Sequence, residues 1–537
     1  MRPYCVLLAF SSGILHRLVT TTTKRLIEKT TNSRLFYNKN SSITLVIYES
    51  SSYDCIQLRE QQMQEQHKYY LHHSIKNSEV QICNDQTICA DTRPYTARSP
   101  KAKFFTNHPG LEVNWSNINQ PICPQLFDKY WLESQHYLKY TDTYFVGNHS
   151  QHSLPFVLRT EKSWHQIFAI QLFFSLNNKK ADWVVHCVPS YKASPAHPVL
   201  IATCLKSKRI LISGTAYAGE IKKSLFSVMN YLLPQESILP MHCAAISCQE
   251  QTTLILGLSG TGKTSLSSSP SFELIGDDEH AWCDEGIFNI EAGCYAKCAD
   301  LSLEREPDIY QAVQNQGVLE NVFLKPNGQP DFNNTSLTQN SRGAFSLKKH
   351  ARFRTTESTA KHPKNIVFLC CDLYGVVPML SRLTHAQARK YFLLGYTAKV
   401  GSTEVGAPPI QPTSSPCFGA PFFPRSYHTY ADLFSKKITA HNSNIWLVNT
   451  GWANGDVHST PRIQLSTSKA IISAIAHNQV DISSEFEYEP LETVSYQKIS
   501  NAPMLDLRPS KTWVQSNEFK TNQALLSQFL NTRITHD

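Results

Sequence analysis

Short apolar stretches recur along the chain, and several of them end directly in glycine or acidic residues. The stretch Thr252–Leu256 is rich in residues that favour β-structure and leads straight into Gly257. The stretch Phe272–Ile275 leads into a glycine and two aspartates, and His362–Asp372 is apolar over most of its length and ends in an aspartate. Runs of this length and composition predict buried strands. We therefore expect three buried strands with flexible or acidic residues at their carboxyl ends.

Other parts of the chain alternate between strand and helix patterns. From Ile210 to Lys223 we expect a strand, a turn and the start of a helix. β-branched and aromatic residues predict strands before this point, so the first half favours a mixed α/β domain. The strands expected there are Tyr144–Val146, Trp183–Val185 and Val199–Ala202, and helices are expected later at Ala386–Leu394 and Asn522–Leu530.

The segment Gly257–Ser265 reads GLSGTGKTS and satisfies the pattern G-x-x-x-x-G-K-[ST]. Its glycines allow backbone N–H groups to approach a polyphosphate, Lys263 can reach the β- and γ-phosphates, and the Thr264 hydroxyl can bind Mg²⁺. The alternative is an ordinary glycine- and serine-rich turn that contains a lysine. The strand expected before the segment favours the nucleotide interpretation.

The chain after this segment differs from the common GTPases and ATPases. Three serines and Pro270 should end any helix after about two turns, because serine favours helix caps and proline cannot continue a helix. The next strand runs into Gly276–His280, which contains adjacent carboxylates at Asp277 and Asp278. Hard divalent cations prefer oxygen ligands held on a rigid element, so these residues predict a metal site. The alternative is a solvated acidic turn.

These two motifs resemble those of ATP-dependent phosphoenolpyruvate carboxykinase, which has G-L-S-G-T-G-K-T-T and L-I-G-D-D-E-H. The resemblance extends from about Arg98 to Ser468 and is densest from Gly214 to Glu404. It implies a two-domain α/β fold, with a mixed-sheet domain over residues 93–237 and a nucleotide- and metal-binding domain over residues 238–537. Residues 1–92 would be a divergent N-terminal region, part of the first domain or an extension of it, and we find no resemblance from Asn32 to Thr92.

The resemblance also implies site residues. In T-G-R-S-P-K-D-K the arginine, here Arg98, holds a substrate carboxylate, and Tyr217 lies at the substrate. The implied Mn²⁺ ligands are Lys223, His242 and Asp278, Thr264 would bind the Mg²⁺ that accompanies ATP, and the catalytic residues would be Lys223, Lys263, Arg342 and Asp277. Substrate contacts would come from Arg98, Tyr217, Lys223 and Arg342. ATP contacts would come from Gly257, Leu258, Ser259, Gly260, Thr261, Gly262, Lys263, Thr264, Ser265, His242, Glu306, Arg342, Arg462, Ile463 and Ser468.

The residue types alone leave alternatives open. Without the resemblance, Arg98 would be a surface arginine in a turn, Lys222-Lys223 a solvated basic pair, and His242 a core histidine. Small residues also depart from the family pattern: Ala97, Ala218 and Ala292 replace glycine, and Ala216 replaces tryptophan. The prolines from Pro408 to Pro416 predict a loop, which in the family closes over the site.

Composition limits the class of partner. The formal net charge of +8 suits anionic small molecules, and the chain lacks a run of Lys and Arg that would favour nucleic acid. Fifteen cysteines contain no C-x-x-C pair, which favours reduced thiols in the cytoplasm. Residues 1–27 have four Lys or Arg and no acid, similar to a transit peptide, and the apolar run within them is too short to span a membrane.

The reaction implied by the resemblance is oxaloacetate plus ATP giving phosphoenolpyruvate, CO₂ and ADP, a step of gluconeogenesis. One alternative is a protein kinase of the HPr kinase type built on the same nucleotide core, against which the matches at Arg98, Tyr217 and Arg342 argue. The other alternative is a non-catalytic nucleotide-binding relative, which the four alanine replacements and the divergent chain ends keep open.

Overall fold

The computed structural model describes residues 34–37, 43–46, 52–83, 87–146, 153–175, 181–258, 260–269, 271–350, 352–353, 359–400, 410–488, 493–496, 498–499 and 506–534. The chain divides into two compact units, Met1–Lys68 and Tyr69–Asp537. In the first unit, β1 (Arg34–Tyr37) pairs antiparallel with β2 (Ile43–Val46). Helix α2 (Ser52–Lys76) begins in the first unit and ends in the second.

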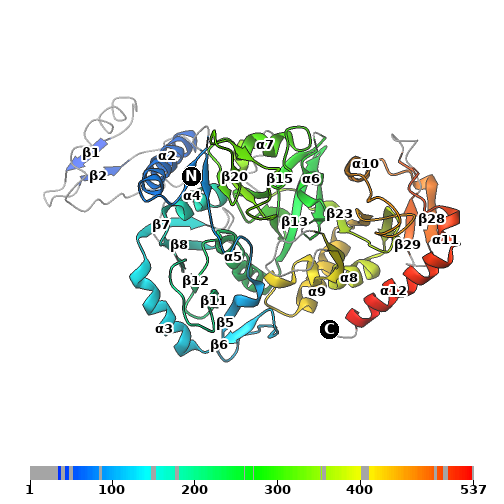
Figure 1. Cartoon of the computed structure of the whole chain (residues 1–537), viewed down its shortest axis with the longest axis horizontal. Coiled ribbons are helices and arrows are strands. Elements are labelled where there is room, and N and C mark those ends of the chain that lie inside the picture. Colours follow the sequence, from blue (N-terminus) through cyan, green and yellow to red (C-terminus); the bar gives the residue numbers. More distant parts are fainter. Residues whose placement is uncertain are drawn as a thin grey trace. The chain divides into compact units, whose positions relative to one another are not determined.

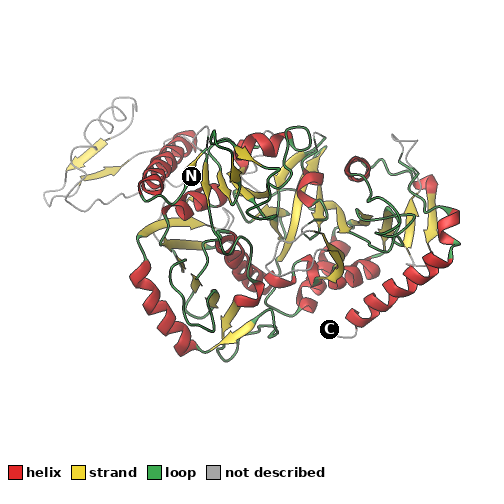
Figure 2. Ribbon diagram, in the orientation of Figure 1, coloured by secondary structure: helices red, strands yellow, loops and turns green. Residues whose placement is uncertain are grey.

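The second unit is a mixed α/β structure in which helices and strands alternate along the chain (Figures 1 and 2). Its first sheet has eight strands in the order β6-β5-β11-β12-β10-β8-β7-β9. The central strands β8, β10 and β12 are parallel and almost wholly buried, as their continuous apolar sequence requires. The strands are β5 (Lys103–Thr106), β6 (Gln120–Ile122), β7 (Tyr140–Val146), β8 (Pro155–Thr160), β9 (Phe174–Ser175), β10 (Trp183–Val188), β11 (Leu200–Cys204) and β12 (Arg209–Ser213).

Three helices accompany this sheet: α3 (Pro124–Ser134), α4 (Ser163–Leu172) and α5 (Gly219–Leu232). Helix α5 packs against strands of both large sheets of the unit (Figure 1). Its Glu220, Lys222 and Ser224 are buried together with its apolar residues, which is unusual for a helix that only supports a sheet. The expected strands and the helix start near Lys223 are therefore confirmed, and α5 brings polar groups into the interior.

The second sheet contains ten strands, in the order β17-β16-β13-β14-β23-β27-β24-β29-β28 with β15 beside β13. Strands β14, β23 and β27 are parallel, so the segments that follow them lie at one edge. All three buried strands expected from the sequence are present. The strands are β13 (Leu239–Cys248), β14 (Gln251–Leu256), β15 (Glu273–Gly276), β16 (Glu279–Trp282), β17 (Ile287–Asn289), β23 (Pro363–Cys370), β24 (Leu380–Leu383), β27 (Asn444–Asn449), β28 (Glu485–Tyr488) and β29 (Thr493–Tyr496).

A five-stranded sheet joins distant parts of the sequence. Its order is β18-β22-β19-β4-β3, with β18 (Gly293–Lys297), β22 (Arg342–Ser346), β19 (Val318–Glu320), β4 (Ile88–Ala90) and β3 (Gln81–Ile82). Strand β4 runs parallel to β19, with Ile88 opposite Val318. Strands β3 and β4 thus complete a sheet whose other strands come from residues 293–346.

Two short hairpins complete the strands of this unit. The first pairs β20 (Phe323–Leu324) with β21 (Pro330–Asp331), and the second pairs β25 (Tyr396–Val400) with β26 (Ile410–Ser414). The second hairpin corrects the expectation of a loop from Pro408 to Pro416, because residues 410–414 form a strand. Pro412 is tolerated there because β26 pairs with β25 alone and is an edge strand. Residues 401–409 lie outside the described part of the chain.

The remaining helices include the expected short helix after the glycine-rich segment, which ends at Ser267. Helix α8 begins with a capping box between Thr384 and Gln387 and ends at Gly395, whose φ of 51° is left-handed. The expected helices at 386–394 and 522–530 are confirmed. The helices are α6 (Lys263–Ser267), α7 (Pro307–Val313), α8 (His385–Leu394), α9 (Tyr427–Ala440), α10 (Leu465–Ala476), α11 (Lys511–Val514) and α12 (Asn517–Ile534).

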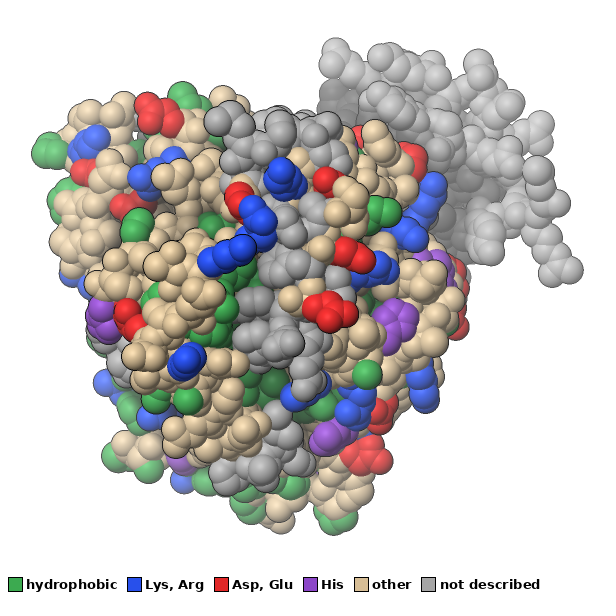
Figure 3. All heavy atoms as spheres, turned by 90° about the vertical axis from the view of Figure 1, so that its right-hand side faces the viewer, with side chains coloured by type: hydrophobic (Ala, Val, Ile, Leu, Met, Phe, Trp, Pro, Cys, Tyr) green, Lys and Arg blue, Asp and Glu red, His purple; other side chains and the backbone are tan. Residues whose placement is uncertain are grey.

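One large apolar core lies where the ten-stranded and five-stranded sheets meet α10. It includes Ile255, Val313, Phe345, Val367 and Ile472, all completely buried. On the face shown in Figure 3, basic side chains lie among acidic, histidine and apolar ones rather than in one continuous patch. Among the described residues, none of the helices combines the length and apolar character of a membrane span.

Candidate active site

The glycine-rich segment Gly257–Ser265 directly follows β14, and Lys263 is the first residue of α6. Gly260 and Gly262 have φ angles of 89° and 93°, which residues with a side chain rarely adopt. Glycine is therefore required at both positions to turn the backbone from the strand into the helix. Ser259, also expected to contact ATP, lies outside the described residues. The local geometry is of the kind that points backbone N–H groups at an anion.

The Lys263 side chain is buried and its ammonium group meets two residues expected to bind metal. Nζ donates to Asp278 Oδ1 at 2.5 Å and lies 3.2 Å from His242 Nε2. Asp278 lies between β15 and β16, and His242 lies within β13, the strand that pairs with β14, β15 and β16. Strand pairing therefore brings the nucleotide lysine and two of the expected metal ligands together.

The imidazole of His242 presents a lone pair to this cluster. Burial, followed by the nearby Lys263 ammonium, lowers the pKa of His242 to about 3, so the ring is neutral and carries one proton. Nδ1 lies 2.9 Å from the Phe418 carbonyl, which can only accept, so the proton is on Nδ1. Nε2 is then unprotonated and lies 3.0 Å from Asp278 Oδ1. Two acceptor atoms at this separation are suited to hold a cation between them.

Two adjacent lysines of α5 reach the same carboxylates. Lys223 Nζ donates to Asp278 Oδ2 at 2.6 Å and to Glu279 Oε1 at 2.8 Å. Lys222 Nζ donates to Asp278 Oδ2 at 2.9 Å and lies 2.9 Å from Glu291 Oε1. Neither lysine is a solvated surface residue, since side-chain exposures are 2% for Lys222 and 12% for Lys223.

The two lysines differ in the direction of their pKa shifts. Burial, together with the charge of Lys222, lowers the pKa of Lys223 despite two carboxylates beside it. Burial would also lower the pKa of Lys222, but the charges of Asp278, Glu291 and Glu279 outweigh burial and raise it. A lysine can bind a metal only after losing its proton. Lys223 is therefore the lysine that loses its proton more readily, and Lys222 is the one that keeps its charge.

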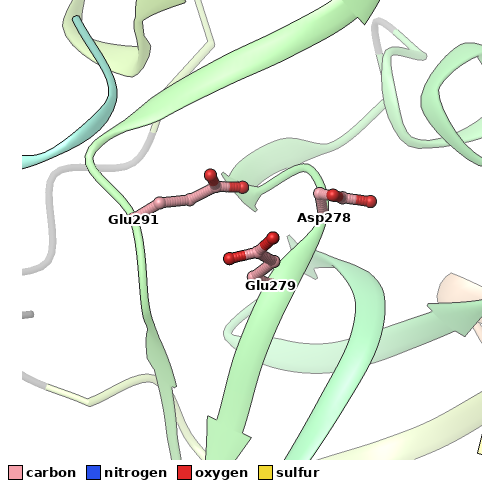
Figure 4. A group of neighbouring side chains, drawn as sticks. All are labelled: Asp278, Glu279 and Glu291. Atoms are coloured by element: carbon pink, nitrogen blue, oxygen red, sulfur yellow. The ribbon is translucent and has the colours of Figure 1, made fainter. Parts of the chain in front are cut away.

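Three carboxylates gather at this point, from Asp278, Glu279 and Glu291 (Figure 4). Their ligand oxygens lie within 4.8 Å of one another. Burial alone would raise the pKa of Asp278. The positive charges of three nearby lysines outweigh burial and hold this pKa well below its usual range. Burial raises the pKa of Glu291, whose side chain is completely buried beside Lys222. A neutral imidazole, a carboxylate and a lysine of lowered pKa form a donor set that fits a divalent cation.

Asp277, expected to be catalytic, lies apart from these three carboxylates. Its side chain is buried, and its Oδ2 accepts a hydrogen bond from the Cys294 thiol at 3.2 Å. Burial and the nearby Asp277 charge raise the pKa of Cys294. Asp277 and Asp278 lie in the bend between β15 and β16, and of these two aspartates Asp278 is the one that contacts the lysines.

The residues expected around the nucleotide are brought to the glycine-rich segment from three directions. Ser265 Oγ donates to Glu306 Oε1 at the start of α7. Arg462 Nη2 donates to the Gly260 carbonyl at 2.8 Å, and Nε donates to the Thr450 carbonyl at 2.8 Å. Helix α10, which carries the buried Ser468, packs against α6. Ile463 N donates to the Gly451 carbonyl at 2.8 Å, which fixes the chain beside Arg462.

Arg98 and Lys223 line one small cavity of about 30 Å³. Both cations lie over the Phe422 ring, Arg98 with its guanidinium carbon at 4.7 Å and Lys223 with Nζ at 4.5 Å from the ring centre. Glu220 also lines the cavity and accepts a hydrogen bond from Ser99 N at 2.7 Å. The expected carboxylate-binding arginine therefore lies beside the expected metal ligand, so one small anion could meet both groups.

Tyr217 and Arg342 are both hydrogen-bonded to the side-chain amide of Asn340. Tyr217 is 3% exposed, and a Cβ on Gly219 would lie 2.5 Å from its ring. Arg342 Nη1 also donates to the Tyr295 carbonyl at 3.4 Å. These contacts fix both side chains at the junction of the five-stranded sheet and α5.

The four alanine replacements need no unusual backbone. None of Ala97, Ala216, Ala218 and Ala292 is among the described residues with positive φ. Ala218 is helical, with φ −67° and ψ −18°, and its N–H donates to Glu320 Oε1 at 2.9 Å. Glycine is not required at any of these positions on conformational grounds, so the replacements give no argument against an active site.

Several residues of the site were not found from the sequence. Glu279, Glu291, Glu220 and Phe422 make the contacts given above, but no role was predicted for any of them, although Glu279 belongs to the L-I-G-D-D-E-H motif. The signal available for Glu279 was its position directly after Asp278. The other three depend on pairing between segments that are distant in sequence, which no local pattern indicates.

The chain matches the phosphoenolpyruvate carboxykinase family over residues 60–503. It is 39% identical over 491 residues to phosphoenolpyruvate carboxykinase (ATP) of Geobacillus thermodenitrificans, covering 86% of this chain and 93% of that protein. The enzyme of the same name from Bacillus pumilus is 40% identical over 465 residues, covering 81% and 88% of the two chains. The family match begins at residue 60, so our expectation of no resemblance from Asn32 to Thr92 is wrong for residues 60–92. Because these matches cover most of its length, the chain belongs to the phosphoenolpyruvate carboxykinase family.

Proposed function

We propose that this protein is an ATP-dependent phosphoenolpyruvate carboxykinase that converts oxaloacetate and ATP into phosphoenolpyruvate, CO₂ and ADP. The observation that carries the proposal is the meeting of Lys263, from the glycine-rich segment, with Lys223, His242 and Asp278. One cluster can then contact both the terminal phosphate and a small carboxylate substrate. Family membership and the names of the relatives support the same reaction.

The proposed substrate half of the site consists of Arg98, Tyr217 and Arg342. A guanidinium group binds a carboxylate with two parallel hydrogen bonds, so Arg98 holds a carboxylate of oxaloacetate beside Lys223. Loss of CO₂ breaks a carbon–carbon bond, whose electron pair becomes the enolate. The enolate oxygen then attacks the γ-phosphorus while ADP leaves. Lys263 and Arg342 stabilise the charge on the transferring phosphoryl group.

The proposed cations are Mn²⁺ on Lys223, His242 and Asp278, and Mg²⁺ bound with ATP at Thr264. When bound, Mn²⁺ supplies Lewis-acid stabilisation of the enolate oxygen. The protein's contribution is to present the unprotonated His242 Nε2 and the Asp278 carboxylate 3.0 Å apart. Thr264 lies in the first turn of α6, one residue after the phosphate-binding Lys263.

The proposed organisation is a substrate domain over residues 93–237 and a nucleotide domain over residues 238–537. In support, the eight-stranded sheet uses strands between Lys103 and Ser213, and the ten-stranded sheet uses strands between Leu239 and Tyr496. We further propose a cytoplasmic location, supported by free thiols at every cysteine whose side chain the structure describes. The proposed partners are oxaloacetate and ATP, without a role for nucleic acid.

A coupled assay of phosphoenolpyruvate formation from oxaloacetate with ATP, Mg²⁺ and Mn²⁺ tests the proposal. Turnover with ATP is expected, with lower activity when GTP replaces it. The Lys263→Met variant should lose at least about 10³-fold in kcat, because a charge stabiliser of the transition state is removed. Its far-ultraviolet circular dichroism should match the wild type. Turnover close to wild type in this variant, or no turnover in the wild type, contradicts the proposal and favours a non-catalytic relative.

A further inference from the structure

The side-chain amide of Asn340 lies between three segments of the candidate site. Asn340 is 1% exposed and lies two residues before Arg342, at the start of β22. Its Oδ1 accepts hydrogen bonds from Arg342 Nε at 3.1 Å and from Arg342 Nη2 at 3.0 Å. Its Nδ2 donates to the Thr96 carbonyl at 2.9 Å and to the Tyr217 hydroxyl at 3.3 Å. One amide therefore uses both of its donors and accepts twice.

The partners determine which way the amide points. A guanidinium group can only donate, and the Thr96 carbonyl can only accept, so Oδ1 must face Arg342 and Nδ2 must face Thr96. The reversed amide would lose these three hydrogen bonds and place two donors against a cation. Only one orientation of this buried amide satisfies all its hydrogen bonds. The amide is therefore held rigidly, because any other orientation would leave buried polar groups unpaired at a desolvation cost.

Each partner belongs to a different part of the proposed substrate half. Thr96 lies two residues before Arg98, Tyr217 precedes α5, and Arg342 opens β22. The two hydrogen bonds that Asn340 Oδ1 accepts from Nε and Nη2 fix the orientation of the Arg342 guanidinium plane. Arg342 Nη1 donates to the Tyr295 carbonyl at 3.4 Å on its other side. One N–H group of Nη1 and one of Nη2 take no part in these three hydrogen bonds.

We propose that Asn340 is a positioning residue that orients Arg342 and Tyr217 together for the phosphoryl-transfer step. This inference rests on the proposed function and adds a residue to it. A guanidinium group stabilises charge on a transferring phosphoryl group only when its N–H groups are aimed at the developing charge. Without the amide, Arg342 keeps its charge but can rotate about its side-chain torsions. The Tyr217 hydroxyl and the Thr96 carbonyl also lose the Asn340 Nδ2 donor that joins them to Arg342.

The experiment compares the kinetics of Asn340→Ala and Asn340→Asp with those of a matched control. Asn340→Ala should lower kcat by about 10- to 100-fold, because two hydrogen bonds to a charged group are lost. ATP affinity measured without oxaloacetate should change by less than about twofold. Asn340→Asp keeps an acceptor for Arg342 but removes both donors, and its carboxylate offsets the guanidinium charge. It should therefore also lower kcat, with its melting temperature close to wild type.

The control is Asn365→Ala, which removes another buried amide with donor and acceptor partners. Asn365 lies in β23 and is 1% exposed; it donates to the Ile475 carbonyl of α10 at 3.2 Å and accepts from Trp446 Nε1 of β27 at 3.0 Å. This variant should lower the melting temperature and leave kcat and the KM values unchanged. Comparing Asn340→Ala with Asn365→Ala separates the general effect of losing a buried amide from the specific effect of losing the amide of Asn340.

A double-mutant cycle with Arg342→Lys identifies the route of the effect. If Asn340 acts through Arg342, adding Asn340→Ala to Arg342→Lys should cost less than about threefold, since the oriented guanidinium is already absent. Additive losses, or wild-type kcat in both folded Asn340 variants, overturn the inference. If Asn340→Ala fails to fold, Asn340→Asp and its cycle with Arg342→Lys decide. Absence of turnover in the wild type contradicts the proposed function itself, whereas wild-type turnover with unaffected Asn340 variants contradicts this inference alone.

Discussion

At the scale of single residues, the site depends on identical side chains placed in different surroundings. Lys222 and Lys223 are neighbours on α5 and both contact Asp278, yet burial lowers the pKa of one while three carboxylates raise that of the other. The same burial leaves His242 neutral with its proton on Nδ1. Residue type alone could not assign these roles, because each depends on the number of charges packed around the group.

Replacing His242 with glutamine should separate the two proposed cation sites. His242→Gln removes the unprotonated imidazole nitrogen that faces Asp278 and substitutes a weaker amide ligand. Mn²⁺ activation of turnover should shift to at least about tenfold higher concentration. The affinity for ATP measured in Mg²⁺ alone should change by less than about twofold, since Thr264 and the glycine-rich segment are untouched. Parallel losses in the two titrations, or no loss in either, would show that one cation site serves both roles.

At the scale of elements, local patterns were sufficient where an element carries its own signal. The glycines and serines around α6 predicted its start and early end, and the apolar runs predicted β14, β15 and β23. The edge strand β26 was missed because Pro412 and the prolines on either side of the strand indicate a loop, whereas a strand that pairs on one side can tolerate a proline. The contact between Glu306 and Ser265 likewise depends on how α7 packs.

The start of α5 offers a test at this scale. A Cβ on Gly219 would lie 2.5 Å from Tyr217 Cε1 and 2.9 Å from Cζ, so the tyrosine ring must move in Gly219→Ala. Alanine itself suits a helix, so the melting temperature should fall by no more than a few degrees. The KM for oxaloacetate should rise by about 10-fold or more, because the displaced ring loses its place beside Asn340.

A second variant shows whether the tyrosine transmits this effect. In the Tyr217→Ala background there is no ring to displace, so adding Gly219→Ala should change the KM for oxaloacetate by less than about twofold. An equal rise in both backgrounds would mean that the glycine matters for another reason, such as the path of the backbone before α5.

At the scale of the whole molecule, the sequence predicted the family, because the resemblance lies in continuous motifs. It did not predict that β4 joins β19, which places the chain before residue 93 in the same sheet as Arg342. Parallel pairing between strands more than two hundred residues apart leaves no local pattern. The same long-range pairing explains why Glu291 and Glu320 were not recognised as site residues.

Glu320 should give the stability of the whole molecule a measurable dependence on pH. It ends β19, is completely buried, and accepts hydrogen bonds from Ala218 N and from the Tyr295 hydroxyl. Burial raises its pKa from 4.5 to about 7 in the folded protein. Between these values the folded state holds a proton that the unfolded state has lost, so stability falls as pH rises from about 4.5 to about 7 and changes no further above it. The shift corresponds to a loss on the order of 3 kcal/mol.

The variant Glu320→Gln isolates this contribution from all other titrations. Glutamine reproduces the protonated side chain, because its Oε1 can accept from Ala218 N and its Nε2 can donate to the Tyr295 hydroxyl. In urea unfolding, the variant should gain on the order of 3 kcal/mol relative to wild type between pH 4.5 and pH 8. The exposed Glu304→Gln should show no such gain. A difference between Glu320→Gln and wild type that stays constant over this range would mean that Glu320 is ionised throughout, with its charge compensated by Arg342, Tyr295 and the Ala218 N–H.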